Sequence, residues 1–100
     1  LEGAEVLVAT SARRALDLLR EHGADLVISD LSMPDMDGFE FMQAVRAEPA
    51  LRHVPAIALS GLAREQDVQR AREAGFSDFM TKPVTLELLS ERVDRLLPRG

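Results

Sequence analysis

The sequence predicts an α/β fold in which a parallel sheet lies between two layers of helices. Three observations support this fold class. Strand-like and helix-like segments alternate four times along the 100 residues. The strand-like runs, such as Val6-Leu7-Val8-Ala9 and Ile57-Ala58-Leu59, are apolar almost without interruption, which is typical of strands buried on both faces of a parallel sheet. This alternation also favours right-handed crossovers, which lead to a doubly wound sheet with helices on both faces.

We expect four strands, each an apolar run that ends in turn residues or in the start of a helix. Their ranges are Glu5–Thr10, Asp25–Asp30, Ala56–Ser60 and Asp78–Thr81. All four end in a residue with a polar side chain, and the ends at Asp30, Ser60 and Lys82 are candidates for a functional site.

The first two helices are predicted from apolar residues at helical spacing. The first runs over about Ser11–His22, with Ser11 as the N-cap and Gly23 as its end. The second runs over about Gly38–Glu48 and is stopped by Pro49. The residues expected on their buried faces are Ala12, Ala15, Leu16 and Leu19 in the first, and Phe41, Met42 and Val45 in the second.

The last two helices differ in how apolar they are. The third, about Arg64–Ala74, offers only Val68 and Ala71 as an inner stripe. The fourth begins after an N-cap at Thr85 and reaches Leu97. Its expected buried face consists of Leu86, Leu89, Val93 and Leu96.

Composition excludes several classes of function. The chain has 12 basic and 17 acidic residues, a net charge of -5, whereas a surface for nucleic acid needs a basic patch. It has no cysteine, which agrees with a reducing compartment, and no apolar run near the roughly 20 residues of a membrane span. The charged N-terminal segment does not resemble a signal peptide. We therefore expect a cytoplasmic protein that contacts neither nucleic acid nor membrane.

Three polar residues close three different strands. Asp30 ends one apolar run and precedes a turn that contains Pro34 and Gly38, Ser60 ends another, and Lys82 follows a third. Ligands of open α/β sheets bind beyond the carboxyl ends of the strands. A carboxylate, a hydroxyl and an ammonium group on one such edge are what phosphoryl binding needs. Asp35 and Asp37, which lie before Gly38, are expected to serve the turn and the start of the following helix.

The segments Asp25–Gly38, Pro55–Gly61 and Asp78–Pro83 together resemble the signature of two-component response regulator receiver domains. The resemblance implies that Asp30 accepts a phosphoryl group from a histidine of a sensor kinase or a histidine phosphotransfer domain. It further implies that Ser60 and Lys82 bind the phosphoryl oxygens. Mg²⁺ would be held by Asp30, by the backbone carbonyl of Ser32 and by an acidic pair that this sequence does not contain.

The same resemblance suggests how the signal is passed on. Ser60 and Phe79 occupy the positions of the family's switch residues. Pro83 occupies the position of a proline that, in the family, usually follows a cis peptide bond. Phe79 packed under the sheet edge, without a switching role, is the competing interpretation. Dimerisation through the last helices is a further expectation of this resemblance.

The resemblance also implies a flavodoxin-like sheet, in which five strands have the order 2-1-3-4-5. The chain matches this pattern only from the second strand onward. We therefore expect residues 1–100 to form an N-terminally incomplete receiver domain, without the family's first strand and helix. Because that strand is the central one, the strand at Glu5–Thr10 is expected to lack a neighbour.

Two alternatives stay open at this point. A pseudoreceiver, which is an interaction module of the same fold that is not phosphorylated, differs from the active form only in the missing acidic pair. A stand-alone regulator and the terminal receiver of a hybrid histidine kinase both fit the sequence, and the phrase Arg70–Phe76 resembles the second group slightly more. In either setting, we expect a signalling domain and not a conventional enzyme.

Overall fold

The computed structural model describes residues 5–62 and 64–97. Four strands form one parallel sheet in the order β1-β2-β3-β4, and the predicted α/β class is confirmed. The strands are β1 (Val6–Ala9), β2 (Leu26–Asp30), β3 (Ala56–Ser60) and β4 (Asp78–Thr81). The helices are α1 (Ala12–His22), α2 (Gly38–Ala47), α3 (Glu65–Ala74) and α4 (Leu86–Leu96), with a short 3₁₀ helix η1 (Pro49–Leu51) after α2.

Strand β1 pairs directly with β2, without the central strand that the receiver family has between the corresponding strands. Residues of β1 and β2 are paired from Val6 with Leu26 to Ala9 with Ser29. The expectation that the first visible strand lacks a neighbour is therefore wrong. Two parallel edges with unpaired N–H and C=O groups gain backbone hydrogen bonds when they meet, whereas a gap would leave these groups buried without partners.

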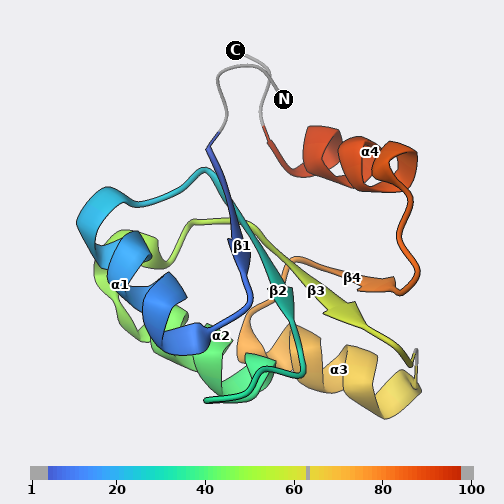
Figure 1. Ribbon diagram of the computed structural model, residues 1–100, viewed down its shortest axis with the longest axis horizontal. Coiled ribbons are helices and arrows are strands. Elements are labelled where there is room, and N and C mark those ends of the chain that lie inside the picture. Colours follow the sequence, from blue (N-terminus) through green and yellow to red (C-terminus); the bar gives the residue numbers. More distant parts are fainter. Residues whose placement is uncertain (1–4, 63, 98–100) are drawn as a thin grey trace.

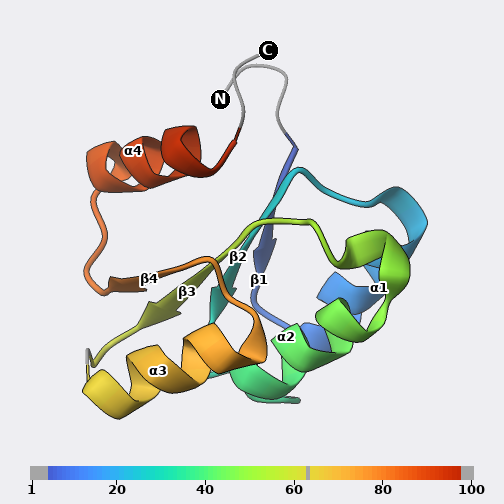
Figure 2. The same cartoon turned by 180° about the vertical axis from the view of Figure 1, so that it is seen from behind.

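Helices cover both faces of the sheet, as expected, but in unequal number. Helices α1, α2 and α3 lie on one side and α4 lies on the other (Figures 1 and 2). The larger core cluster joins the three helices to the sheet and contains Phe41, Met42 and Val45 of α2, all fully buried. The smaller cluster, on the α4 side, is formed by Leu26, Ile28, Ile57, Met80 and Val93.

The apolar side chains predicted to be buried are buried in α1 and α2, but not all of them are buried in α4. All four apolar residues predicted for α1 are buried. In α4, Val93 is fully buried, whereas Leu86 has 78% of its surface exposed, so its predicted burial is wrong. Within the described residues, α4 is the only helix on its face, and its first turn has no neighbouring helix to pack against.

Arg46 of α2 holds three segments together on the side of the larger core. Its guanidinium donates to the carbonyl of Gly75 from Nε at 3.1 Å and from Nη2 at 2.9 Å. Its Nη1 donates to the carbonyls of Leu51 at 2.9 Å and Arg52 at 3.1 Å. Gly75 has a φ of +115°, and a Cβ there would lie 2.7 Å from Cγ of Arg46. The left-handed end of α3 and the close approach of Arg46 therefore both require glycine.

No helix within residues 5–62 and 64–97 combines the length and the apolar character that crossing a membrane requires.

The first turns of the helices lie near the carboxyl ends of the strands that precede them. This arrangement places the predicted site residues at one edge of the sheet.

Candidate functional site

Asp30, Ser60 and Lys82 come together at the carboxyl edge of the sheet. Asp30 is the last residue of β2 and is aligned with Leu59 of β3, and Ser60 is aligned with Thr81 of β4. Lys82 follows Thr81 directly, and its backbone N–H donates to the carbonyl of Ser60 at 2.7 Å. The parallel register of three strands thus brings residues that are 52 positions apart to one edge.

Lys82 and Asp30 form an ion pair. Nζ of Lys82 donates to Oδ2 of Asp30, and the other carboxylate oxygen, Oδ1, accepts the backbone N–H of Ser32 at 3.0 Å. Lys82 is the only lysine among the 12 basic residues of the chain, the other 11 being arginines. The single lysine is a feature of the sequence that points to residue 82, because lysine has a compact charge that arginine lacks.

The ion pair sets the charge state of Asp30. Burial of the carboxylate acts to raise its pKa, but the hydrogen bonds from Lys82 and Ser32 and the positive charge of Lys82 outweigh it. The pKa of Asp30 is therefore lowered from its ordinary value of 3.8. Asp30 is ionised at neutral pH, and its side chain keeps 28% of its surface exposed.

Ser60 takes part in the local backbone structure next to this pair. Its hydroxyl oxygen accepts the backbone N–H of Leu62 at 3.2 Å. The hydroxyl therefore caps the turn that leaves β3, and it stands one strand away from Asp30. Lys82 continues into Pro83 through a cis peptide bond.

The loop after Asp30 is closed tightly at its base. The backbone N–H of Gly38 donates to the carbonyl of Leu31 at 2.9 Å. A Cβ at residue 38 would lie 2.7 Å from the carbonyl oxygen of Asp30 and 2.7 Å from Cα of Leu31. Gly38 is therefore needed because the start of α2 approaches the backbone of Asp30 and Leu31. Asp37 is the N-cap of α2, as expected, and accepts the N–H of Glu40 at 2.8 Å.

Asp35 has a different role from the one that the sequence suggested. It was expected to serve the turn and the helix that follow it, but its carboxylate contacts the N-terminus of α1. It accepts the backbone N–H groups of Ala12 at 3.0 Å and Arg13 at 2.9 Å, and the hydroxyl of Ser11 at 3.2 Å. These backbone and side-chain donors lower the pKa of Asp35. The sequence carries no local signal for this contact, because its partners lie 22 to 24 residues away.

Phe79 of β4 lines a pocket between α3 and β4. The pocket has a volume of about 310 Å³, and Val68, Ala71 and Phe76 also contribute to its wall. The Phe79 side chain is half-buried and packs against the larger core. Phe79 therefore lies near the surface formed by α3 and β4.

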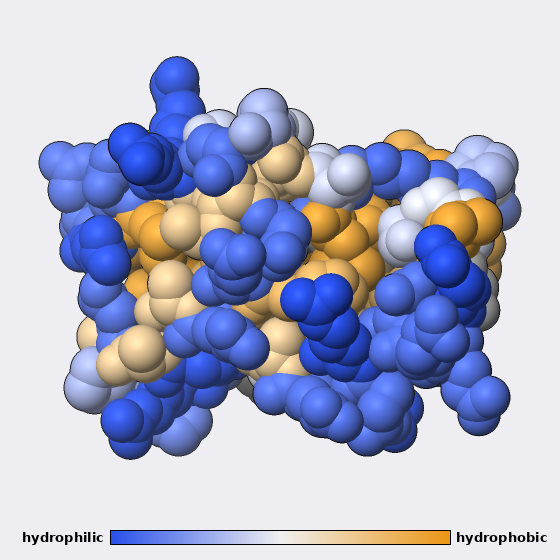
Figure 3. Space-filling model, turned by 90° about the horizontal axis from the view of Figure 1, so that it is seen from below, coloured by the Kyte–Doolittle hydropathy of each residue, from blue (hydrophilic) through white to orange (hydrophobic). Residues whose placement is uncertain are grey.

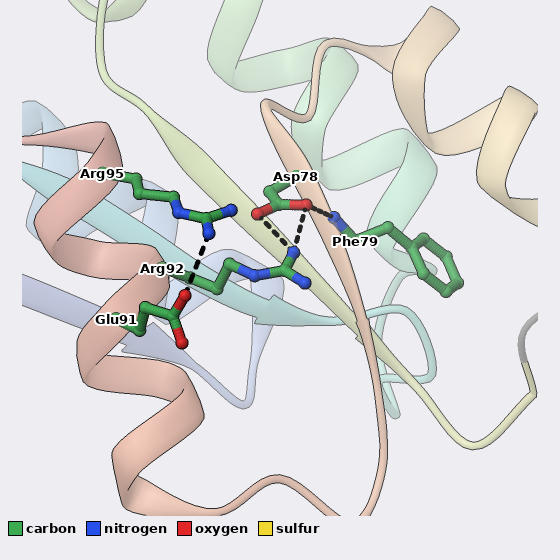
Figure 4. A network of polar contacts seen from close by, with 5 residues as sticks. All are labelled: Asp78, Phe79, Glu91, Arg92 and Arg95. Carbon is green, nitrogen blue, oxygen red and sulfur yellow. Dashed lines mark hydrogen bonds and ion pairs between the residues drawn. The ribbon is translucent and has the colours of Figure 1, made fainter.

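Asp78 links the backbone of Phe79 to α4 (Figure 4). Its Oδ1 accepts the backbone N–H of Phe79 at 2.8 Å, and Nη1 of Arg92 donates to both carboxylate oxygens at 2.9 and 2.8 Å. The pairing with Asp78 raises the pKa of Arg92. One turn along α4, Arg95 donates to Glu91 at 2.9 Å.

Oxygen ligands for a cation are few at this edge. Residues 5–62 and 64–97 contain no group of three or more His, Cys, Asp or Glu side chains that could hold a metal ion. The Asp30 carboxylate and the backbone carbonyl of Ser32, two residues further along the chain, are nevertheless hard oxygen donors. One or two carboxylates together with water and phosphate oxygens are a usual ligand set for Mg²⁺, so these two groups suit part of such a site.

Comparison with known proteins agrees with this geometry. Residues 1–94 match the response regulator receiver domain family. A 14.6 kDa uncharacterized protein of Leptolyngbya boryana is 51% identical over 89 residues, which cover 88% of this chain and 68% of that protein. The polar-differentiation response regulator DivK of Brucella ovis is 33% identical over 95 residues, covering 95% of this chain and 77% of DivK.

Solved structures show the same relationship. The signal receiver domain of a signal transduction histidine kinase from Syntrophus aciditrophicus superposes with a TM-score of 0.83 at 32% sequence identity, covering 95% of this chain and 90% of that domain. Receiver domains are signalling modules of two-component systems. On the family match, these relatives and the shared fold, the chain belongs to the response regulator receiver domain family.

Proposed function

We propose that this protein is a phosphoacceptor of a two-component phosphorelay and that Asp30 receives the phosphoryl group. The observation that carries the proposal is the ionised Asp30 carboxylate at the carboxyl edge of the sheet, paired with the only lysine of the chain. The donor is the phosphohistidine of a sensor histidine kinase or of a histidine phosphotransfer domain, and the reaction takes place in the cytoplasm.

In the proposed transfer, a carboxylate oxygen of Asp30 forms a bond to phosphorus while the bond from phosphorus to the donor imidazole breaks. The electron pair of that bond returns to the imidazole nitrogen, and the product is an aspartyl phosphate. The low pKa of Asp30 supports this role, because the carboxylate needs no base to become a nucleophile at neutral pH.

Two side chains of this protein can stabilise the negative charge on the phosphoryl oxygens. Lys82 supplies a positive charge at the site. The Ser60 oxygen accepts the N–H of Leu62, so its own O–H stays available to donate to a phosphoryl oxygen. Asp30 and the Ser32 carbonyl would hold Mg²⁺, which supplies further stabilisation of the oxygens when it is bound.

The phosphorylated state is read, in this proposal, through Ser60 and Phe79. A phosphoryl oxygen that accepts the Ser60 O–H draws the hydroxyl toward Asp30. Phe79, which lines the pocket at α3 and β4, then has room to change its rotamer. If the two packings differ in free energy by only about a few kcal/mol, binding of one phosphoryl group is sufficient to shift the equilibrium between them.

An apolar band on the surface supports protein contacts as the output. It crosses the middle of the face shown in Figure 3, where hydrophilic residues interrupt it and also border it. Leu62, in the loop after Ser60, has 55% of its surface exposed. Apolar surface bordered by charge is a usual feature of protein interaction sites.

Phosphorylation of the purified protein tests the proposal. With acetyl phosphate and Mg²⁺, we expect a mass increase of one phosphoryl group that hydroxylamine removes, because an acyl phosphate is labile to it. Asp30→Asn should abolish the increase, and Asp17→Asn, the same change on the exposed face of α1, should retain it. Equal labelling of wild type and Asp30→Asn would reject the assignment. No labelling of the wild type would favour the pseudoreceiver.

A further inference from the structure

The contact between Asp35 and the N-terminus of α1 joins the acceptor loop to a helix that precedes it in the chain. The loop runs from Leu31 to Asp37, between Asp30 and α2. One end of it carries the Ser32 N–H, which donates to Asp30. Asp35, an exposed residue near the other end, accepts two backbone N–H groups and one hydroxyl of α1.

Helix α1 has an N-cap residue of its own that it does not use. Ser11 has the extended backbone of an N-cap, with a φ of -137° and a ψ of 126°, but its side chain makes no capping hydrogen bond. A serine at this position normally accepts an N–H of the first turn. Here its hydroxyl donates to Asp35, which accepts the N–H groups in its place.

This arrangement indicates that the contact serves the loop more than the helix. If Asp35 were absent, Ser11 could turn its hydroxyl to the first turn of α1 and restore a cap. The loop, in contrast, would lose all three hydrogen bonds of Asp35 to α1. A carboxylate at the positive end of a helix makes these bonds stronger than neutral ones.

We propose that Asp35 is a positioning residue, which anchors the acceptor loop on α1 and thereby holds the Ser32 N–H at Asp30. The inference rests on the proposed function of Asp30 where it concerns phosphoryl transfer. The anchoring of the loop does not depend on that function and can be measured separately.

Amide hydrogen exchange and phosphorylation by acetyl phosphate test the inference in Asp35→Ala. We expect the amides of Ser32 and Gly38 to exchange faster by about tenfold or more, and phosphorylation of Asp30 to slow by about tenfold, because small displacements of a reacting group cost rate. Exchange of Leu16 and Leu19 in α1 should stay as in the wild type. Asp17→Ala, which removes the same charge from α1, is the matched control and should change neither quantity.

A pair of variants separates loop anchoring from helix capping. Ser11→Ala and Asp35→Ala should each leave the thermal midpoint nearly unchanged, since either residue can cap α1 alone. The double variant should lower it by more than the sum of the two. Asp35→Asn, which keeps an acceptor oxygen without the charge, should restore part of the loop protection.

Each outcome decides the inference. Unchanged exchange of Ser32 and Gly38 in Asp35→Ala overturns it, and so does faster exchange throughout α1, which would make Asp35 a helix cap only. Faster loop exchange with an unchanged phosphorylation rate overturns the positioning role. If the wild type itself takes up no phosphoryl group, the proposed function of Asp30 fails, and the exchange data alone decide whether Asp35 anchors the loop.

Discussion

The ammonium group of Lys82 contacts Oδ2 of Asp30, although the two residues are 52 positions apart in the sequence. The contact joins the ends of β2 and β4 across the intervening strand β3. It places the only lysine of the chain on the one carboxylate that ends a buried strand.

Replacing Lys82 with Met should raise the pKa of Asp30. Burial of Asp30 remains in the variant, whereas the hydrogen bond and the charge that lower the pKa are lost. A carboxyl carbon NMR titration of Asp30 in both proteins measures the change. An unchanged pKa would show that Ser32 and other backbone donors are sufficient to lower it.

The same pair predicts a dependence of stability on pH. Because the pKa of Asp30 is lowered in the folded state, its stabilising contribution is present above the unfolded-state pKa and is lost as the pH falls through the folded-state value. The difference in unfolding free energy between wild type and Lys82→Met should therefore be largest near neutral pH and shrink below about pH 4. Urea unfolding across this range checks it, and a difference that is constant with pH would contradict it.

Gly38→Ala should destabilise the protein by roughly 1–3 kcal/mol, because the new Cβ meets backbone atoms of Asp30 and Leu31 that cannot move aside easily. Gly61→Ala is a matched control at the same edge of the sheet, where a Cβ has no heavy atom within 4 Å. Urea unfolding of the two variants measures the difference. Equal effects would indicate that the close approach at residue 38 is relieved by a small loop shift.

Arg46→Met should destabilise the protein by about 2–3 kcal/mol, since it leaves the carbonyls of Gly75 and Leu51 without this donor. The pKa of Arg46 is lowered by burial, in agreement with its position between α2, η1 and the end of α3. Arg20→Met, which breaks an ion pair with Glu48 at a half-exposed site, should cost only about 0–1 kcal/mol. Chemical denaturation of both variants ranks the two arginines.

The Asp78–Arg92 pair should show a larger coupling energy than the Glu91–Arg95 pair on the same helix. Arg92 contacts both oxygens of Asp78, and the two side chains are 32% and 27% exposed. Arg95 and Glu91 are 67% and 54% exposed. Double-mutant cycles should give about 1 kcal/mol for the first pair and about 0.3–0.5 kcal/mol for the second. The reverse order would show that the link between β4 and α4 contributes little.

Ser60→Ala should still accept a phosphoryl group on Asp30, more slowly, while losing most of the response at α3 and β4. The hydroxyl that would move to the phosphoryl oxygen is absent, so Phe79 keeps its place. Amide spectra with and without beryllofluoride, a phosphoryl mimic, measure the response in both proteins. A wild-type response confined to residues 30–38 would contradict a switch through Ser60 and Phe79.

The order of the elements and nearly all of their bounds follow from local patterns. Predicted and observed strands agree for Ala56–Ser60 and Asp78–Thr81, and the helices differ by one residue at their ends. Apolar runs, helical spacing and cap residues are properties of neighbouring positions, so a single chain is sufficient to read them. The edge that unites Asp30, Ser60 and Lys82 follows in the same way, because parallel strands all end at one side of a sheet.

The partners of polar groups and the pairing of strands depend on contacts between distant segments. Asp35 caps α1 instead of serving the helix that follows it, and β1 pairs directly with β2. Leu86 has the spacing of a buried residue but is exposed, because α4 is alone on its face among the described helices. In each case the outcome is set by which groups lie within reach after folding, and unpaired backbone groups take the nearest available partner, whatever its position in the sequence.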